Sequence, residues 1–398
     1  MISVCSAESA AARQLLLQKN EFEQRKTNSR REFSSLYEAL RRKNALPDYL
    51  AEECSPHKYI EEGEALFLAK GALSPSLLES YFDCPYKCFA SKGLYLEERQ
   101  EATVLSTDTG NFIHKLLELM TDRIYQCADE DTFASEARAK AAELMQDERL
   151  LPKEDTLAGA YSSEKLLEEG VQIARVVYRQ VRDSAFDRIS KEKKILTADV
   201  RGKVDRVDEN EQYVRVVDYK TGGITADVKS YYMGLKLQME LYMSAVRGEK
   251  IPVGVLYFPA SVSFSGSEEG KFRMQGFLNG DAAALSCGDR TLSGSQKSEH
   301  FEAALTQNRG GNVIPGDMFP DFLDYALYVS RGAKQELKEG YVACSPVKTS
   351  THCACTWCKF GGMCGFHQER LEGRNVPKTS SKQVVEIVRK RKGEEQDE

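Results

Sequence analysis

Apolar positions recur with helical spacing in several parts of the chain. In residues 109–125 one apolar stripe predicts an amphipathic helix: Phe112, Ile113, Leu116, Leu117, Met120 and Ile124. Helix is also predicted for residues 7–46, after a Ser74–Pro75 start, for 133–183 in two pieces split near Pro152, for 230–247, and for 319–340.

Strand patterns are concentrated in the middle of the chain. Strands are predicted from about residue 195 to residue 220, and VGVLYF at 253–258 is typical of a short buried strand. Residues 262–300 are rich in Gly and Ser and are predicted to be loops around one short strand, while the charged last 20 or so residues are predicted to fray. Together these patterns indicate an α/β protein.

The segment VDRVDENEQYVRVVDYKTGG, at 204–223, has the pattern of a hairpin. If Glu211 and Gln212 form its centre, Asp205 lies opposite Asp218, with Cβ atoms ~4.5–5.5 Å apart. Two carboxylates so placed repel each other unless a cation lies between them, and hard divalent cations bind carboxylate oxygens. Alternation along a strand places Lys220 on the same face as Asp218. The hairpin therefore predicts a metal site with an ammonium group beside it.

A solvated hairpin with ordinary surface charges is the alternative interpretation. Val214, Val216 and Val217 leave both faces of the second strand partly apolar, so its end is expected to be half-buried. That burial weakens the alternative, because unpaired charges are costly away from water.

Composition narrows the class of protein. The 398 residues, 41% of them hydrophobic, suit one large domain or two smaller ones. The net charge of −6 gives no general support for nucleic-acid binding, so any such surface must be local. No apolar run reaches the ~18–20 residues that span a membrane, and the start lacks the pattern of a signal peptide. A cytoplasmic location is expected.

Four cysteines have the spacing of a metal site. Cys355-x₂-Cys358-x₅-Cys364 lies near the end of the chain, and Cys84 lies far upstream in YFDCPYKCF. A CxxC with a third nearby cysteine favours bound metal, but zinc and iron–sulfur sites are not separated by spacing alone. Unrelated buried thiols are the alternative, and Cys88 and Cys353 are close enough in sequence to be confused with ligands.

Several motifs together resemble PD-(D/E)XK nucleases of the RecB-like branch. These are GKVDRVD…VRVVDYKTGG, a G-x-x-x-H at 110–114, and a G-x-x-x-Q-x-x-x-Y at 234–242. The resemblance implies a restriction-endonuclease-like core, a small mixed sheet flanked by helices. It also implies roles for seven residues: Mg²⁺ ligands His114, Asp205, Asp218 and the carbonyl of Tyr219, a water-activating Lys220, and Gln238 and Tyr242 as residues that position the DNA strand.

The order of the motifs is similar to the carboxy-terminal nuclease domain of AddB subunits of AddAB helicase–nucleases, from about residue 64 onward. This similarity implies a [4Fe–4S] cluster held by Cys84, Cys355, Cys358 and Cys364, which would close a loop of roughly 270 residues. It further implies a Mg²⁺-dependent exonuclease acting on single-stranded DNA, delivered by an AddA-type subunit during double-strand-break repair.

The chain departs from that family in two respects. AddB subunits carry a helicase-like amino-terminal portion, so residues 1–70 are expected to be a helical remnant of it in a truncated chain, with the nuclease domain at 71–376 and a charged tail at 377–398. Many relatives place a glutamate on the strand before the first aspartate, where Glu192 is the weak candidate. Two alternatives stay open: a free-standing iron–sulfur exonuclease of the CRISPR spacer-acquisition type, and a non-catalytic DNA-binding or assembly fragment.

Overall fold

The computed structural model of the chain describes part of its length. Described are Leu15 and residues 30–43, 58–69, 71–97, 106–147, 150–151, 157–223, 226–260, 272–305, 312–348, 352–361, 363–364, 373–375 and 379–397. Most of the helix predicted for 7–46, and the split near Pro152, lie outside these residues.

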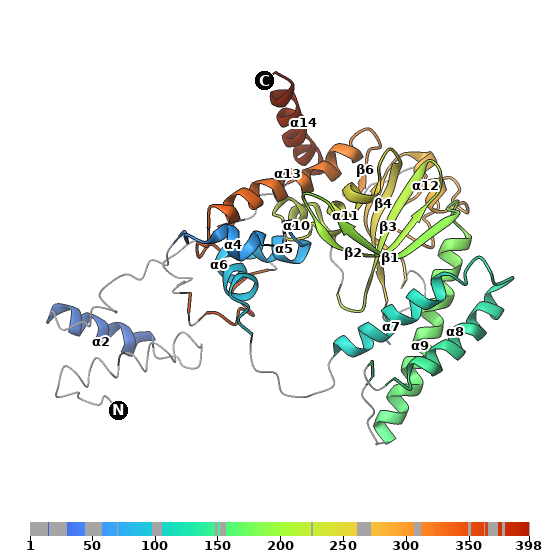
Figure 1. The fold of residues 1–398 in the computed structure, drawn as a ribbon, viewed down its shortest axis with the longest axis horizontal. Helices are drawn as coiled ribbons and strands as arrows, with labels where there is room; N and C mark the ends of the chain where they lie inside the picture. The colour runs from blue at the N-terminus through green and yellow to red at the C-terminus, as the bar shows by residue number, and fades with distance from the viewer. Residues whose placement is uncertain are drawn as a thin grey trace. The chain divides into compact units, whose positions relative to one another are not determined.

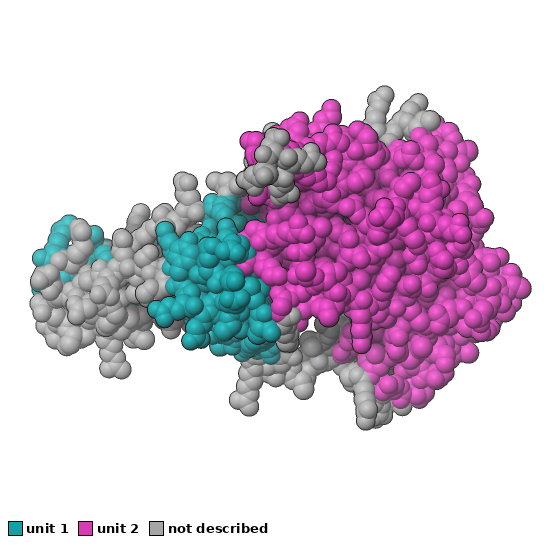
Figure 2. Space-filling model, turned by 45° about the horizontal axis from the view of Figure 1, so that its top comes forward, with its two compact units in different colours: residues 1–69, 80–98, 335–376 teal, residues 70–79, 99–334, 377–398 magenta. Residues whose placement is uncertain are grey.

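The chain divides into two compact units, coloured separately in Figure 2. Unit 1 combines residues 1–69, 80–98 and 335–376, and unit 2 combines residues 70–79, 99–334 and 377–398.

A six-stranded mixed sheet is the centre of unit 2 (Figure 1). Its strands follow chain order: β1 (Arg188–Leu196), β2 (Arg201–Glu209), β3 (Tyr213–Lys220), β4 (Ile251–Pro259), β5 (Gln275–Asn279) and β6 (Val313–Ile314). The first three strands are antiparallel, β4 runs parallel to β3, β5 is antiparallel to β4, and β6 is parallel to β5. The predicted α/β architecture with a small mixed sheet is confirmed.

Helices cover both faces of this sheet. On one face lie α7 (Ser106–Thr121), α8 (Glu130–Leu144), α9 (Leu157–Arg182) and α12 (Ala282–Gly288). The predicted apolar stripe of α7 is buried in one core with α9 and with Val217, Tyr219 and Phe258 of the sheet. Tyr231 and Phe322 pack against Phe277 of β5 on the opposite face. That face is covered by α10 (Val228–Tyr232), α11 (Gln238–Val246) and α13 (Phe319–Lys338), with α14 (Ser381–Asp397) paired to α13.

Unit 1 contains shorter elements. They are α2 (Arg30–Arg42), α4 (Gly63–Leu68), α6 (Pro85–Cys88), a π-helix (Phe89–Gly93), and the two-stranded pair β7 (Val347–Lys348) and β8 (Arg374–Asn375). Helix α5 (Pro75–Asp83) begins in unit 2 and ends in unit 1. Its predicted start is confirmed, because Ser74 Oγ accepts the backbone N–H of Leu77 at 3.3 Å.

The predicted register of the β2–β3 hairpin is confirmed. Arg206 pairs with Val217 and Asp208 pairs with Arg215, the positions expected for a turn centred on Glu211 and Gln212. This register makes Asp205 and Asp218 the next residues beyond the last pair of the ladder.

A buried charge cluster lies on the hairpin's other face. Asp208 accepts two hydrogen bonds from the Arg206 guanidinium, at 2.7 Å each, and two from Arg215, at 2.6 and 2.9 Å. All three side chains are excluded from solvent. Burial opposes charge on Asp208, but the two guanidiniums outweigh it and hold the pKa of Asp208 below its ordinary value. The Arg215 guanidinium also lies 4.8 Å above the ring of Phe186, which shields it from water.

Four details of the predicted elements were wrong. Strand β1 begins at Arg188 rather than near 195, and the single helix predicted for 230–247 is two helices. They are separated at Gly234, whose φ of +75° is incompatible with helix. A helix, α12, occupies part of the predicted loop region, and the predicted frayed end contains α14. Helix α14 is ordered because Val384, Val385 and Val388 are buried.

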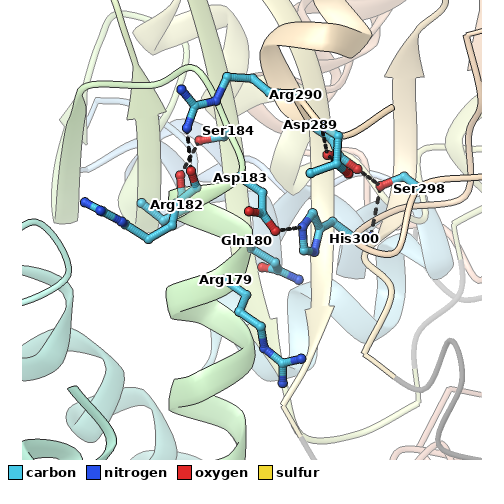
Figure 3. Close-up of polar contacts among 12 residues, drawn as sticks. Arg179, Gln180, Arg182, Asp183, Ser184, Asp289, Arg290, Ser298 and His300 are labelled. Carbon is cyan, nitrogen blue, oxygen red and sulfur yellow. Dashed lines mark hydrogen bonds and ion pairs between the residues drawn. The ribbon is translucent and has the colours of Figure 1, made fainter. Parts of the chain in front are cut away.

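Polar contacts fasten the Gly/Ser-rich region to the end of α9 (Figure 3). His300 Nε2 lies 2.8 Å from Asp183 Oδ2, and the N–H of Arg290 donates to the carbonyl of Asp183 at 2.7 Å. Ser298 Oγ donates to Asp289 Oδ2 at 2.6 Å. These bonds pair polar groups that no β-ladder or helix pairs in this loop region. No helix among the described residues is long and apolar enough to cross a membrane.

We expect Asp208→Asn to lower the free energy of unfolding by about 3–5 kcal/mol, because it leaves two buried guanidiniums without their shared counter-charge. Denaturant unfolding followed by circular dichroism measures the effect. Glu211→Ala, at the exposed turn of the same hairpin, is the control and should change little. A loss below about 1 kcal/mol for Asp208→Asn would show that the cluster does not hold the hairpin.

Candidate active site and cysteine cluster

The strands β2 and β3 separate at the point where their two aspartates lie. The ladder ends at the Arg206–Val217 pair although both strands continue. In place of a ladder bond, Asp205 Oδ2 accepts the backbone N–H of Tyr219 at 3.0 Å. His114 Nδ1 of α7 lies 3.3 Å from the same oxygen. The separation gives one carboxylate both a backbone donor and an imidazole neighbour.

Asp218 is the more strongly perturbed carboxylate. Burial raises its pKa to about 6, and the nearby Asp205 carboxylate adds to the effect. Lys220 Nζ lies 2.7 Å from its Oδ2, and the Gln238 side-chain amide donates to its Oδ1 at 3.0 Å. Asp218 Oδ2 accepts no hydrogen bond of normal geometry, although it is buried. One oxygen of Asp218 is therefore oriented by Gln238, and the other lies beside the Lys220 ammonium.

The position of His114 depends on how closely α7 approaches the sheet. A Cβ on Gly110, one turn earlier, would lie 3.1 Å from Thr221 Oγ1, which is tighter than an ordinary contact, so the glycine eases the close approach of the helix. The His114 ring meets the edge of the Tyr219 ring, at 5.8 Å between centroids. The Tyr219 ring is buried and also contacts Phe258, so the backbone of Tyr219 is anchored from the core.

Tyr242 lies inside the protein. Only 5% of its surface is exposed, and burial raises the pKa of its phenol. Its hydroxyl lies over β2, where a Cβ on Gly202 would come within 2.4 Å of it. Tyr242 lies four residues after Gln238 on α11 and packs against Gly202 of the strand that carries Asp205.

A cavity of about 510 Å³ opens beside these residues. Its lining includes His114, Asp205 and Lys220, and among its other charged residues are Lys203 and Glu192. Strand pairing places Glu192 opposite Asp205, since its two neighbours pair with Arg206 and Val204. Glu192 has a φ of +49° and is ion-paired with Lys203. The structure thus brings Glu192 to the cavity, which sequence reasoning suggested only weakly.

A divalent cation fits the donors at this place. Carboxylate and carbonyl oxygens are ligands that Mg²⁺ prefers, and a positive charge would relieve the repulsion between Asp205 and Asp218. Within the described part of the chain, no three acidic, His or Cys side chains already converge on one point.

The cysteines gather in unit 1. The nearby Cys84 contributes to raising the pKa of the Cys344 thiol. In the same way Cys358 contributes to raising the pKa of Cys84, and Cys364 to raising that of Cys358. Burial raises the pKa of the Cys84 and Cys358 thiols, while backbone N–H groups around Cys84 oppose the rise. Cys355 also contributes to raising the pKa of Cys344. The four cysteines expected to be ligands, together with Cys344, influence one another's pKa values, but no three of the described Cys, His or acidic side chains are placed to hold a metal ion. Soft thiolates fit either an iron–sulfur cluster or zinc.

A fifth cysteine, Cys344, belongs to this group and was missed. Its Sγ donates to the carbonyl of Cys364 at 3.0 Å, and a thiol–thiol hydrogen bond to Cys364 raises the pKa of Cys344. Its spacing from Cys355 matches no common metal motif, so only the folded chain reveals it.

Comparison of the sequence with known protein families covers the residues of this site. Residues 72–365 match the model of the PD-(D/E)XK nuclease superfamily. The chain belongs to that superfamily.

Among curated proteins the chain is similar to proteins named as one subunit of an ATP-dependent helicase/deoxyribonuclease, the subunit known as AddB. It is 27% identical to those of Bacillus licheniformis, Lachnoclostridium phytofermentans and Bacillus subtilis, over 81%, 80% and 80% of this chain. The matched part covers 32%, 31% and 32% of those relatives, so the chain spans about a third of their length. The expected relationship to AddB subunits is confirmed.

The raised pKa of Asp218 predicts a pH-dependent effect on stability. Above about pH 6 the folded state holds Asp218 charged in an unfavourable environment, so we expect Asp218→Asn to melt at a higher temperature than the parent in chelator. As the pH falls through about 6, Asp218 takes up a proton in the folded state before it does so in the unfolded chain, and the difference should shrink.

Differential scanning fluorimetry across this pH range measures that difference. Asp187→Asn, at an exposed carboxylate, is the control and should show no such trend. An Asp218→Asn variant less stable than the parent above pH 6 would contradict the assignment.

Proposed function

We propose that this chain is a Mg²⁺-dependent exonuclease domain that hydrolyses phosphodiester bonds of single-stranded DNA within a helicase–nuclease complex for double-strand-break repair. The observation that carries the proposal is that Asp205, Asp218, Lys220 and Gln238 lie together where β2 and β3 separate, beside a cavity of about 510 Å³. Superfamily membership supports the same chemistry.

Each residue has a role that follows from its contacts. His114, Asp205, Asp218 and the carbonyl of Tyr219 would hold Mg²⁺, which supplies Lewis-acid polarisation and a more acidic bound water. Lys220 extends from the buried Asp218 to the cavity, where its ammonium orients the attacking water and stabilises the charge that develops on the phosphate. Gln238 orients Asp218 through its side-chain amide, and Tyr242 supports β2 by packing against Gly202.

Phosphate binding is local, as the overall charge of −6 requires. Lys203, Lys220 and Lys115 line the cavity. Glu192 neutralises Lys203 in the absence of DNA, so a phosphate that pairs with Lys203 would displace it. Binding through such contacts weakens as salt rises.

The cysteine group supports a structural cluster in unit 1. We assign Cys84, Cys355, Cys358 and Cys364 as ligands of a [4Fe–4S] cluster, which would tie residues near 84 to those near 360. Metal bound at such a site contributes directly to folding stability.

An AddA-type motor subunit is the partner we propose. The relatives' name joins an ATP-dependent helicase to a deoxyribonuclease, which suggests that a motor supplies the single strand. The free-standing exonuclease and the non-catalytic fragment are the alternatives.

The first test concerns catalysis. Asp218→Ala and Lys220→Ala should each reduce Mg²⁺-dependent cleavage of a labelled single-stranded oligonucleotide by at least about a hundredfold, since each removes a group acting at the reacting phosphate. Lys194→Ala, an exposed lysine on β1, should cut like the parent. Variants that retain parental cleavage would show that the site is elsewhere.

Adding the partner in the same assay distinguishes the alternatives. An AddA-type subunit with ATP should raise the cleavage rate on duplex ends. A rate that the partner leaves unchanged favours the free-standing exonuclease, and no cleavage under any condition favours the non-catalytic fragment.

The second test concerns the cluster. Protein purified without oxygen should be brown and carry about four irons per chain. Cys355→Ala should lose the colour and melt at a lower temperature, because the site's binding energy is also folding energy. Cys88→Ala and Cys353→Ala should keep both. A colourless preparation with zinc would overturn the cluster and leave the nuclease site intact.

The fifth thiol is tested in the same series. Cys344→Ala should retain iron. Loss of iron in Cys344→Ala together with a brown Cys364→Ala would show that Cys344, and not Cys364, is the ligand.

A further inference from the structure

The start of α11 lacks a cap from its own sequence. Its N-cap residue, Leu237, has an apolar side chain and makes no capping hydrogen bond. The first backbone N–H groups of a helix have no partner within the helix, so they need an outside acceptor. Here Glu79 of α5 supplies it. Its Oε1 accepts the N–H of Leu237 at 3.0 Å and that of Gln238 at 3.3 Å.

Several groups around Glu79 act on its charge in opposite directions, and their net effect raises its pKa. Burial raises its pKa, but the two N–H groups and the charges of Lys236 and Lys220 oppose the rise. The partial positive charge of a helix N-terminus adds to that attraction. The neighbouring Glu240 does not compete for it, because burial raises the pKa of Glu240 to about 8 and leaves it neutral at physiological pH.

The helix start that Glu79 holds also carries an active-site contact. Gln238 is the first residue of α11, and its side-chain amide donates to Asp218 Oδ1 at 3.0 Å. The backbone of Gln238 is thus bonded to Glu79 while its side chain is bonded to Asp218. A shift of the helix start would move the amide away from the carboxylate.

We propose that Glu79 is a positioning residue for the nuclease site: its carboxylate fixes the start of α11 and so holds the Gln238 amide against Asp218. Glu79 touches neither substrate nor reacting atoms in this role. The inference rests on the proposed function of the site for its catalytic consequence, although the positioning itself is read from contacts.

A double-mutant cycle on the full chain tests the proposal. Glu79→Ala should lower kcat for Mg²⁺-dependent cleavage roughly tenfold or more, the usual effect of removing a group that orients a metal-site residue. The KM for the oligonucleotide should change little. Glu79→Ala combined with Gln238→Ala should be no worse than Gln238→Ala alone, because both act on one contact. Glu79→Gln keeps an acceptor oxygen and should restore most of the activity.

The matched control is Asp227→Ala. Asp227 caps α10 by accepting the N–H of Ser230 at 2.9 Å, but α10 carries no residue of the site. This variant should lose comparable thermal stability and keep kcat. Fully multiplicative losses in the double mutant, or an equal loss of kcat in Asp227→Ala, would overturn the proposal.

Mn²⁺ affinity, measured by electron paramagnetic resonance without DNA, separates this proposal from the proposed function. Glu79→Ala should weaken Mn²⁺ binding roughly tenfold, and Glu79→Gln should not. Unchanged affinity in a folded Glu79→Ala would overturn the positioning role. If Glu79→Ala does not fold, the shorter Glu79→Asp replaces it, with the same expected weakening. Mn²⁺ binding without any cleavage by the parent would count against the nuclease activity and not against Glu79.

Discussion

The buried ion cluster of Arg206, Asp208 and Arg215 is the constraint on which the site depends. A strand that slips by one residue turns every side chain to the opposite face. In the β2–β3 hairpin such a slip would separate Asp208 from Arg215, its partner across the ladder, and leave buried charges uncompensated. The cost of that state excludes it. The register that remains is the one that brings Asp205 and Asp218 to the same place.

The charges on the two faces of the hairpin are balanced in different ways. On one face Asp208 is fully satisfied by two guanidiniums, which stabilises the fold. At the other, Asp205 and Asp218 share weaker partners: one ammonium, one amide, one imidazole and one backbone N–H. The satisfied cluster makes this carboxylate pair possible, because the sheet cannot rearrange to relieve the repulsion. A site that is ready for a cation results.

Local patterns in the sequence were enough to predict the hairpin, its register and the apolar stripe of α7. These depend on alternation and helical spacing, which neighbouring residues determine. The start of β1 was missed because RISKEKKIL is mostly polar, and it pairs with β2 through backbone bonds that side chains do not reveal. Helix α14 was not predicted because it is held by a distant residue. Arg389 of α14 binds Asp321, more than sixty positions earlier in the chain.

The residues of the site also divide into those that local patterns predict and those that only the fold reveals. Asp205, Asp218, Lys220 and Gln238 stand in recognisable motifs, and the structure brings them together. Glu79 and Cys344 do not, because their contacts are made by residues distant in the chain, and no spacing rule links Glu79 to Leu237. The inward position of Tyr242 was equally hidden, since a helical period gives a face but not what covers it.

The close approach of Tyr242 to Gly202 links the residues that the two positions can hold. The phenol occupies the space in which any larger residue at 202 would place its Cβ. A side chain at 202 would therefore require the Tyr242 ring to move away from β2. The two positions are 40 residues apart in the chain, and a side chain at 202 fits most easily together with a smaller residue at 242.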